Sequence, residues 1–460
     1  MRPGDTIKIN ITSINSEGEG VGRYGEEGFV VFVPGVLPGE RAACRVIKVG
    51  KNYATAALIK LETQSERRVA PKCPIFGRCG GCQLQHASYD LQLEIKAQVL
   101  HDAFRRIGGV TPERPVACVA SPKQWMYRNK TTLPVHGSRS GKGKPLISGY
   151  YERRSHKVVP FTTCAVLEPE LERVVRDALD YLSSSGFTGY NESSGTGDIR
   201  HIAARSGSLP RDSALLLGCV AAKDPDARKF GKLRNLRQSL MKHNPSLRGA
   251  ALNIKTDAGN FIWGPVFKPL NGSRLVRQQL GGYQYDVDIS AFFQINTAQT
   301  EQLFSYVGEL LRDFASGKIL ELYSGVGSLT AYLASNCEAV DAVEEWRPAA
   351  KLLQANMALN GLANVSLHMD EAERFMRNAA PGYDAVVLDP PRSGCAEDVI
   401  AGILRVAPKG IAYVSCNPAT LARDVARLTS GGDYKLESLA AFDMFPQTAH
   451  VESVALLRKR

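Results

Sequence analysis

The stretch KILELYSGVGS, residues 318–328, decides the fold of the last third of the chain. It begins with a short apolar run, typical of a buried strand, and continues into a turn that contains Gly325 and Gly327. Glycine in such a turn lets backbone amides approach a ligand closely. Phosphate-binding turns and purely structural turns share the Gly-x-Gly pattern, so the stretch alone predicts a strand, a turn and a helix without identifying a ligand.

Further apolar strands follow, separated by helical stretches. We expect strands at 318–322, 339–343, 385–388 and 410–414, with a helix over 348–360. Strands that alternate with helices predict an α/β fold in which a parallel sheet is wound with helices. Ligands of such sheets bind beyond the carboxyl ends of the strands, so the residues that follow each strand are the candidate site residues.

Two acidic residues follow these strands. Glu344 ends the second strand about 20 residues after the glycines, where a carboxylate can accept hydrogen bonds from two ribose hydroxyls. The third glycine of a dinucleotide-binding turn is missing, which favours S-adenosylmethionine as the cofactor. Asp389 follows the third strand, and the stiff Pro390-Pro391 would orient its carboxylate beside cofactor and substrate. A simple strand-ending turn is the alternative.

The fourth strand ends in Ser415-Cys416-Asn417-Pro418, just before a helix. Most single cysteines at strand ends are small core residues, but a helix N-terminus and a cationic cofactor would both favour the reactive thiolate of Cys416. A thiolate that adds to carbon 6 of uracil makes carbon 5 nucleophilic enough to attack a methyl sulfonium. The proton on carbon 5 must then leave, and we assign that general base to Glu452, in the polar stretch 445–452.

The N-terminal segment 1–62 has the pattern of short strands. Ile7, Ile9 and Ile11 alternate with polar residues, and glycine-rich turns separate the apolar runs, which predicts a small closed β-barrel. With its basic residues the barrel resembles the TRAM domain, an OB-like RNA-binding module; a purely structural barrel is the alternative. The basic residues are Arg45, Lys48, Lys51 and Lys60.

A cysteine cluster follows the barrel. Cys73, Cys79 and Cys82 are spaced C-x5-C-x2-C, and Cys164 could supply a fourth thiolate from far along the chain. Four thiolates suit zinc or an iron–sulfur cluster, and this spacing does not decide between the two or exclude unligated thiols. The N-terminus lacks the apolar core of a signal peptide, so we expect a cytoplasmic protein whose ten cysteines are thiols, ligands or catalysts rather than disulfides.

Composition limits the class of protein. A chain of 460 residues predicts two or three domains, and 44% apolar content with 22% charged residues is ordinary for a folded globular protein. The formal net charge of +11 favours a polyanionic partner such as RNA but does not identify it. No apolar run approaches the length of a membrane span, so no membrane partner is expected. Aromatic residues lie among cations at 125–130 and 197–201, a combination found in RNA contacts and in solvated faces alike.

Taken together, the stretches 321–327, 389–392, 415–418 and 443–452 resemble the bacterial RNA (uracil-5-)-methyltransferase family of the TrmA/RumA type. The resemblance implies a Rossmann-like class I methyltransferase domain in which Cys416 is the nucleophile and Glu452 is the base. The family's FFQ-N element matches 292–296, so the resemblance also implies a set of S-adenosylmethionine-binding residues. That set is Gln294, Tyr323, Ser328, Glu344 and Asp389, with adenine contacted by one of the adjacent Asp370 and Glu371.

The chain departs from the family at two positions, since the family often has Asp where Glu321 stands and Cys where Ser324 stands. Neither change removes a group that the chemistry requires. The resemblance further implies a [4Fe-4S] cluster on Cys73, Cys79, Cys82 and Cys164, which we expect to stabilise the fold because the methylation needs no electrons. It also implies that Arg128 and Lys130 contact RNA near a flipped-out uridine.

The resulting domain organisation has a TRAM barrel at 1–62, a central α+β domain carrying the iron–sulfur cluster at 63–284 and the methyltransferase domain at 285–460. The segment 91–121 could pack with the methyltransferase domain. Relatives with a TRAM domain and a cluster act chiefly on 23S ribosomal RNA and those lacking both act on transfer RNA, so 23S rRNA is favoured and tRNA is the alternative. We expect a monomer.

Two rival functions are weighed against this one. A radical S-adenosylmethionine methylthiotransferase also combines a TRAM domain with an iron–sulfur cluster, but its C-x3-C-x2-C signature is missing. A non-catalytic RNA-binding protein would have no need of Cys416 and Glu452, and both are present.

Overall fold

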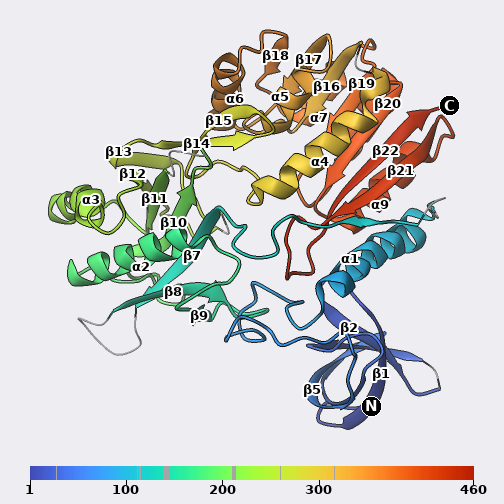
Figure 1. The fold of residues 1–460 in the computed structure, drawn as a ribbon, viewed down its shortest axis with the longest axis horizontal. Coiled ribbons are helices and arrows are strands. Elements are labelled where there is room, and N and C mark those ends of the chain that lie inside the picture. The colour runs from blue at the N-terminus through green and yellow to red at the C-terminus, as the bar shows by residue number, and fades with distance from the viewer. Residues whose placement is uncertain are drawn as a thin grey trace. The chain divides into compact units, whose positions relative to one another are not determined.

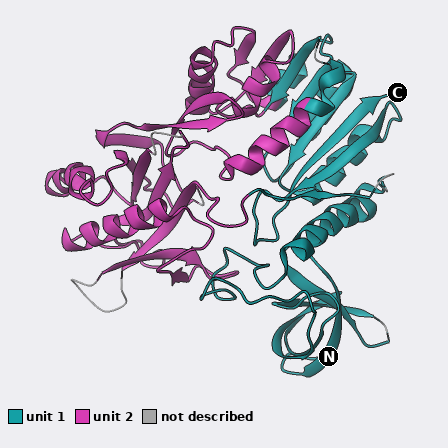
Figure 2. Cartoon of the chain, in the orientation of Figure 1, with its two compact units in different colours: residues 1–122, 309–322, 373–460 teal, residues 123–308, 323–372 magenta. Residues whose placement is uncertain are grey.

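The structure is a computed structural model that describes residues 1–26, 28–110, 112, 115–137, 145–209, 214–259, 261–314 and 316–460. The chain forms two compact units, each assembled from separate segments (Figure 2). The first unit comprises Met1–Pro122, Glu309–Leu322 and Glu373–Arg460, and the second comprises Lys123–Gly308 and Tyr323–Ala372. Within the described residues, none of the helices combines the length and apolar character that a membrane span requires.

The first unit begins with a barrel of short strands (Figure 1). The barrel is closed and has five strands in the order β1-β2-β3-β5-β4. Alternate side chains along β1 are buried in the barrel core, including Ile7, Ile9 and Ile11, which confirms the barrel predicted from their spacing. Gly20 and Gly22 allow close packing, because a Cβ at Gly20 would lie 2.2 Å from the Val36 side chain. The strands are β1 Thr6–Ile14, β2 Glu19–Tyr24, β3 Phe29–Pro34, β4 Arg41–Val49 and β5 Tyr53–Thr63.

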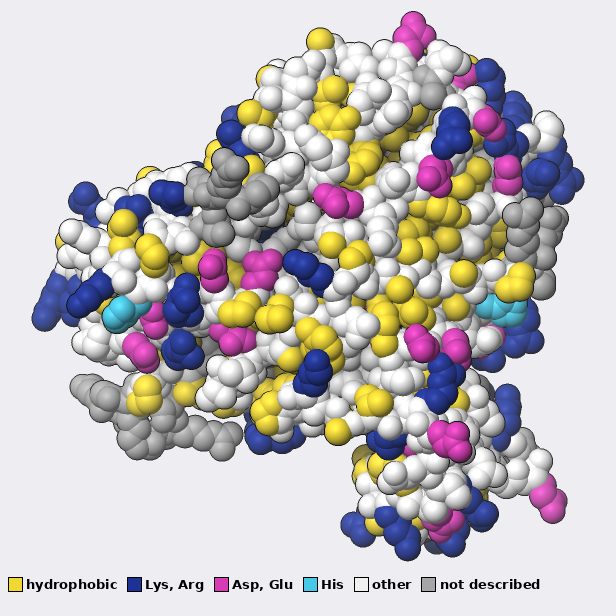
Figure 3. Space-filling view, in the orientation of Figure 1, with side chains coloured by type: hydrophobic (Ala, Val, Ile, Leu, Met, Phe, Trp, Pro, Cys, Tyr) yellow, Lys and Arg dark blue, Asp and Glu magenta, His cyan; other side chains and the backbone are white. Residues whose placement is uncertain are grey.

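The barrel surface is basic. Lys and Arg side chains gather over it in the space-filling view (Figure 3). The exposed cations of the barrel strands and their connections are Lys8, Arg23, Arg41, Arg45, Lys48, Lys51 and Lys60. A positive surface of this kind suits the phosphate backbone of RNA.

The first unit also contains a mixed sheet. β16, β19 and β20 run parallel, whereas β22 pairs antiparallel with β20 and with β21, and the short β6 pairs with β21. All residues of β19 and β20 are buried, as expected for central strands covered on both faces. The strands are β16 Lys318–Leu322, β19 Ala385–Leu388, β20 Gly410–Ser415, β21 Tyr434–Phe442, β22 Glu452–Lys459 and β6 Cys118–Val119. The helices are α1 Tyr89–Ala103, continued by a π-helical turn at Phe104–Gly108, α8 Glu397–Val406 and α9 Pro418–Thr429, with α7 Ala372–Asn378 at the boundary between the units.

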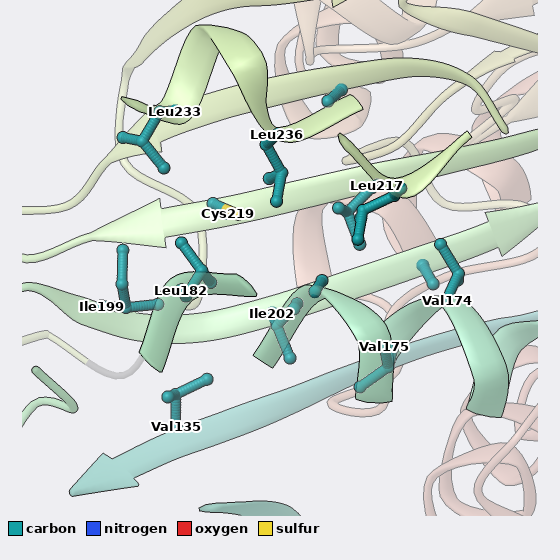
Figure 4. Packing of buried hydrophobic residues seen from close by; sticks show 14 of the residues in the cluster. Val135, Val174, Val175, Leu182, Ile199, Ile202, Leu217, Cys219, Leu233 and Leu236 are labelled. Atoms are coloured by element: carbon teal, nitrogen blue, oxygen red, sulfur yellow. The ribbon is translucent and has the colours of Figure 1, made fainter. Parts of the chain in front are cut away.

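The second unit is built on a seven-stranded sheet in the order β13-β12-β11-β10-β7-β8-β9. Side chains on one face of the sheet, such as Ile202 and Leu217, pack against Val174 of α2 and Leu236 of α3 (Figure 4). The strands are β7 Lys130–Gly137, β8 Leu146–Tyr151, β9 Val158–Pro160, β10 Ile199–Ser206, β11 Leu215–Ala221, β12 Leu247–Ile254 and β13 Val266–Gly272, and the helices are α2 Pro169–Ser184 and α3 Ala227–Leu240.

The rest of the second unit holds a hairpin, helices and a parallel strand pair. In α6, the Asn356 side chain accepts a hydrogen bond from the Asp286 amide (2.8 Å) and donates one to the Val326 carbonyl (2.9 Å), which ties the helix to β15 and to the glycine turn. These elements are β14 Leu275–Leu280, β15 Tyr283–Asp288, α4 Thr297–Leu310, α5 Ser328–Ala334, β17 Ala339–Val343, α6 Arg347–Leu359 and β18 Val365–His368.

Candidate active site

Cys416 lies in a tightly fixed turn between β20 and α9 of the first unit. The side chain of Asn417 caps α9 by accepting a hydrogen bond from the Ala419 amide (3.1 Å), and Ser415 Oγ accepts one from the Asn417 amide (3.1 Å). Pro418 occupies the first turn of the helix, where its missing N–H costs nothing. The half-buried thiol of Cys416 is therefore held at a rigid helix start.

The loop after Asp389 is joined to the same helix. The Arg392 carbonyl accepts hydrogen bonds from Asn417 Nδ2 (3.0 Å) and from Thr420 Oγ1 (3.3 Å). Further along the loop, the buried Asp424 carboxylate accepts a hydrogen bond from the Cys395 amide (2.9 Å). The loop that starts at Asp389 and the turn that carries Cys416 are consequently parts of one rigid assembly.

Glu452 opens β22, directly opposite Phe442 of β21, and is only 3% exposed. Burial and then the neighbouring Asp389 charge raise the pKa of the Glu452 carboxyl well above its ordinary value, and Arg392 opposes that rise. Burial raises the pKa of Asp389 to about 7. A raised pKa makes the Glu452 carboxylate a stronger proton acceptor than an ordinary carboxylate, which suits a general base.

Glu452, Asp389 and Arg392 also shift the pKa of the Cys416 thiol. Burial raises the pKa of Cys416 above its ordinary value, and the Glu452 and Asp389 charges raise it further. The Arg392 guanidinium lowers this pKa, through its charge and through a hydrogen bond with the thiol. Sequence reasoning expected the helix N-terminus and a cationic cofactor to favour the thiolate, and it missed Arg392, whose only signal was its place at the end of Asp-Pro-Pro-Arg.

The raised thiol pKa predicts a pH-dependent reactivity. Alkylation of Cys416 by iodoacetamide, followed by peptide mass spectrometry, should accelerate from pH 6.5 to pH 8.5, because only the thiolate reacts. The slope should stay below the roughly tenfold per pH unit of an isolated thiol, since Asp389 gains its negative charge in the same range and raises the thiol pKa further. Arg392→Gln should slow the reaction at every pH in this range, and Asp389→Asn should steepen the slope. A rate that is already constant above pH 6.5 would contradict the raised pKa.

In the second unit, the turn after β16 is fixed by Glu344. One carboxylate oxygen of Glu344 accepts a hydrogen bond from the Gly325 amide and the other from the Trp346 amide, both at 2.8 Å. Burial raises the pKa of the Glu344 carboxyl. Each oxygen keeps lone-pair capacity for a further donor, so these two hydrogen bonds leave room for the ribose contact that the sequence predicts, and that contact stays a prediction.

The backbone of this turn is constrained on both sides. Tyr323 has φ of 66°, which is left-handed and uncommon for a residue with a Cβ, and Gly327, at the N-cap of α5, has φ of 86°. A Cβ at Gly327 would lie 2.9 Å from the Leu353 and Met357 side chains, so this glycine allows α6 to approach. Tyr323 and Ser328, at the two ends of the turn, thus flank a backbone of fixed shape.

The other predicted cofactor residues lie on two separate segments of the second unit. Gln294 is 6% exposed, and its carbonyl accepts a hydrogen bond from Asn129 Nδ2 (3.2 Å). Asp370 is half-buried and Glu371 is exposed, and the Glu371 amide donates to Asp370 Oδ1 (2.9 Å).

Lys130 and Arg128 differ in placement. The Lys130 ammonium donates to the Ala291 carbonyl (3.1 Å), and burial, followed by the nearby Arg205 charge, lowers its pKa well below the ordinary value. Arg205 faces Lys130 across the β7–β10 pair and donates to the same carbonyl (2.7 Å). Arg128, half-buried, holds its guanidinium 5.5 Å from the centre of the Tyr150 ring. The side chain of Lys130 therefore supports the segment that precedes Gln294, a role that sequence reasoning did not foresee.

The stretch 197–201, also considered for RNA contact, serves the fold of the second unit. Asp198 accepts hydrogen bonds from the amide and hydroxyl of Thr188, both at 2.9 Å, and forms an ion pair with Lys229 (2.5 Å). Arg200 donates to the Lys255 and Asp257 carbonyls at 3.1 and 2.8 Å. Both charged groups are thereby engaged inside the unit.

The cysteines of the predicted metal site are half-buried. The Gly81 amide donates to Cys79 Sγ at 3.4 Å, and the Val166 and Leu167 amides are hydrogen-bonded to the Cys164 sulfur. Such amide contacts accompany thiolates that hold iron–sulfur clusters. Yet across the described ranges no three His, Cys, Asp or Glu side chains gather closely enough to hold a metal ion, so the cluster stays a prediction.

Two protein-family models match the chain, one at each end. The TRAM domain model matches residues 2–59, and the tRNA (uracil-5-)-methyltransferase family model matches residues 276–460. An RNA methyltransferase of Halalkalibacterium halodurans is 34% identical, covering 99% of this chain and 98% of the relative, and one of Synechocystis is also 34% identical, covering 99% and 96%.

A solved structure agrees with these matches. The Pyrococcus abyssi tRNA (uracil-54, C5)-methyltransferase, crystallised with S-adenosyl-L-homocysteine, is 26% identical to the chain with a TM-score of 0.74, covering 98% of this chain and 100% of that one. The barrel, the α/β elements and the four motif stretches, together with relatives that match over nearly their whole length, establish that the chain belongs to the S-adenosylmethionine-dependent RNA (uracil-5-)-methyltransferase family and carries an N-terminal TRAM domain.

Proposed function

We propose that this enzyme methylates carbon 5 of one uridine in RNA through a covalent bond between Cys416 Sγ and carbon 6 of the base. The observation that carries the proposal is that the turn of Cys416 is hydrogen-bonded to the Arg392 carbonyl, and that the charges of Glu452, Asp389 and Arg392 all shift the pKa of the thiol. A nucleophile, a base of raised pKa and a cation that stabilises the thiolate are the groups that this chemistry requires.

The proposed reaction begins at the thiolate. Cys416 Sγ adds to carbon 6, and the electrons of the C5–C6 double bond move toward O4 as an enolate, which makes carbon 5 nucleophilic. S-adenosylmethionine supplies the electrophilic methyl group. The Glu452 carboxylate then takes the proton from carbon 5, the double bond re-forms and the S–C6 bond breaks, which returns Cys416 as a thiolate beside Arg392.

The second unit supplies most of the residues that we propose for the cofactor. Glu344 accepts hydrogen bonds from the ribose hydroxyls, because its oxygens are held toward the glycine turn yet retain accepting capacity. Gln294, Tyr323, Ser328 and Asp389 complete the proposed set, and either Asp370 or Glu371 contacts adenine.

We further propose 23S rRNA as the substrate of a monomeric enzyme in the cytoplasm. The TRAM barrel with its basic surface and the spacing of Cys73, Cys79 and Cys82 support rRNA, because the family resemblance implies that members with both features act chiefly on 23S rRNA. Transfer RNA is the second candidate, favoured by the Pyrococcus abyssi neighbour. Either uridine must leave its stack to expose the ring face to a thiolate, and Arg128 and Lys130 are our candidates for its RNA contact.

The [4Fe-4S] cluster is proposed as a structural group on Cys73, Cys79, Cys82 and Cys164. The all-thiol donor set and the amide contacts to Cys79 and Cys164 support it. No step of the methylation passes through it. Iron and acid-labile sulfide in anaerobically purified protein would test this assignment, and their absence together with unchanged thermal stability of Cys73→Ser would reject it.

Mapping of 5-methyluridine tests the proposed function directly. In a strain that lacks the gene, one uridine of 23S rRNA should lose its 5-methyl group while tRNA keeps its own, and the purified enzyme should restore the mark on unmodified rRNA. Loss from tRNA alone would replace rRNA with tRNA as the substrate. Unchanged 5-methyluridine in both RNAs, with no activity of the purified enzyme on either, would overturn the function.

A further inference from the structure

The loop 443–451 that leads into Glu452 is held by segments that lie between 347 and 366 residues away in sequence. The Gln447 carbonyl accepts hydrogen bonds from the Gln83 amide (3.1 Å) and the Leu84 amide (2.9 Å). The side chain of Gln83 makes a further contact, because its Oε1 accepts a hydrogen bond from the Ala449 amide (3.2 Å). Gln83 therefore contacts the loop through both its backbone and its side chain.

Helix α1 holds the same loop from a second direction. Gln92 Oε1 accepts a hydrogen bond from the Gln447 amide (2.9 Å), and Gln92 Nε2 donates to Gln447 Oε1 (3.1 Å). One turn further along α1, Lys96 forms a fully buried ion pair with Asp443 and donates to the Phe445 carbonyl (3.1 Å). The loop is thus tied to α1 at its start and at its middle.

Gln447 itself has an unfavourable backbone. Its φ of 72° lies in the left-handed region, which residues with a Cβ rarely adopt, and it is only 2% exposed. Such a conformation persists only where the surroundings over-determine it. Gln83, Leu84 and Gln92 supply that constraint through hydrogen bonds to both the backbone and the side chain of Gln447.

Gln83 also belongs to the cysteine segment. It follows Cys82 directly, and its Nε2 donates to the Gly80 carbonyl (2.7 Å) inside the turn between Cys79 and Cys82. A Cβ at Gly18 of the barrel would lie 2.6 Å from Gln83 Cβ and 3.1 Å from Ala449 Cβ. The cysteine turn, a barrel turn and the loop before Glu452 therefore share one packed junction.

The strand pairing makes Glu452 sensitive to this junction. Glu452 is the first residue of β22 and pairs with Phe442, the last residue of β21, so the loop 443–451 closes on that pair. Strand ends fray more readily than strand interiors. A loop that loses its anchors would loosen the pair at the position of the carboxylate.

We propose that Gln447, held by Gln83 and Gln92, is a positioning residue that fixes the base Glu452, so that the cysteine turn 79–82 supports proton removal from carbon 5. This inference rests on the proposed role of Glu452. In this proposal Gln447 acts through Glu452 and is not itself a catalytic residue.

The order of the reaction steps provides a measurement, the build-up of the covalent adduct, that a general loss of stability would not change. Addition of Cys416 and methyl transfer precede proton removal, so a misplaced base should slow only the release of RNA from the covalent adduct. Gln447→Ala and Gln83→Ala should each lower kcat about 10²-fold, the loss typical of an ångström-scale misplacement. Both variants should build up a complex with ordinary RNA that survives denaturing electrophoresis, while the rate of adduct formation stays within about threefold of wild type.

Two controls sharpen the experiment. Leu236→Ala, in the core of the second unit, should lower the melting temperature without any adduct build-up, which separates instability from positioning. Gln447→Gly keeps the left-handed backbone at no steric cost and should lose less activity than Gln447→Ala. If the glutamine variants slow adduct formation and release equally, or only melt earlier, the positioning role is rejected while the proposed function stands. If wild type forms no Cys416 adduct at all, the proposed function fails and this inference fails with it.

Discussion

Replacing Cys416 with alanine should reduce uridine methylation by more than about 10⁴-fold, because the variant has no nucleophile with which to activate carbon 5. Cys416→Ser should lose almost as much, since a hydroxyl forms its anion far less readily than a thiol. Methyl transfer from tritiated S-adenosylmethionine to unmodified RNA measures the loss. Binding of S-adenosylmethionine, followed by calorimetry, should change little, because the cofactor residues remain.

A second assay identifies the bond itself. RNA that carries 5-fluorouridine at the target cannot lose a proton from carbon 5, so the wild-type enzyme should remain attached to it, and mass spectrometry should place the attachment on Cys416. Cys337→Ala provides a matched cysteine control and should behave like wild type, because this thiol lies outside the proposed machinery. A Cys416→Ala enzyme that retains a tenth of wild-type activity would refute covalent catalysis.

Glu452→Gln should produce the second-largest effect, a loss of product release of about 10²- to 10⁴-fold, the range that a single general base contributes. Glutamine preserves the size of the side chain but cannot accept the proton from carbon 5. The variant should therefore methylate once, remain bonded to ordinary RNA and appear as a shifted band in a denaturing gel. Rapid turnover by this variant would assign the base to another residue.

The same substitution should stabilise the protein at alkaline pH. Because the folded-state pKa of Glu452 is raised, its favourable neutral form dominates at low pH, and stability declines as the pH rises through that pKa. Glutamine stays neutral, so the melting temperature of the variant should exceed that of wild type at pH 8 and approach it at pH 5. An equal difference at both pH values would contradict the raised pKa of Glu452.

The elements with the clearest sequence periodicity were predictable. Alternating Ile7, Ile9 and Ile11 gave the barrel, and uniformly apolar runs gave β19 and β20, because burial on one face or on both leaves a direct trace in the sequence. The ends of those strands then led to Asp389 and Cys416. Such residues are found by local pattern because each strand end is itself a local signal.

Lys130 shows what local pattern leaves out. As a cation among aromatic residues it predicts an RNA contact, and the structure adds that its ammonium donates to the Ala291 carbonyl. That placement follows from the register of β7 against β10, which sets Lys130 opposite Arg205. Two cations that face each other across a strand pair need a shared acceptor. The two strands lie about 70 residues apart in sequence, so neither segment alone reveals that they pair.

The glutamine network was missed for the same reason. Gln83, Gln92 and Gln447 are unremarkable polar residues in their own segments, and only the packing of α1 against the loop 443–451 reveals them. Arg392 is part of the Asp-Pro-Pro-Arg motif, but the motif does not reveal that this arginine lowers the pKa of the Cys416 thiol. That effect depends on the hydrogen bond that holds the loop against the start of α9. Tertiary placement, rather than residue type, decides the role of each.

The hydrogen bonds and the ion pair between α1 and the loop 443–451 also have a consequence during translation. Gln92 and Lys96 leave the ribosome early, but their partners Gln447 and Asp443 emerge only after Cys416 and strand β21 have been made, and before β22. A nascent chain that ends before residue 443 thus carries the nucleophile without the base and leaves Lys96 with no counter-charge. Such an unfinished chain is unable to complete a catalytic cycle, because it lacks the proposed base Glu452.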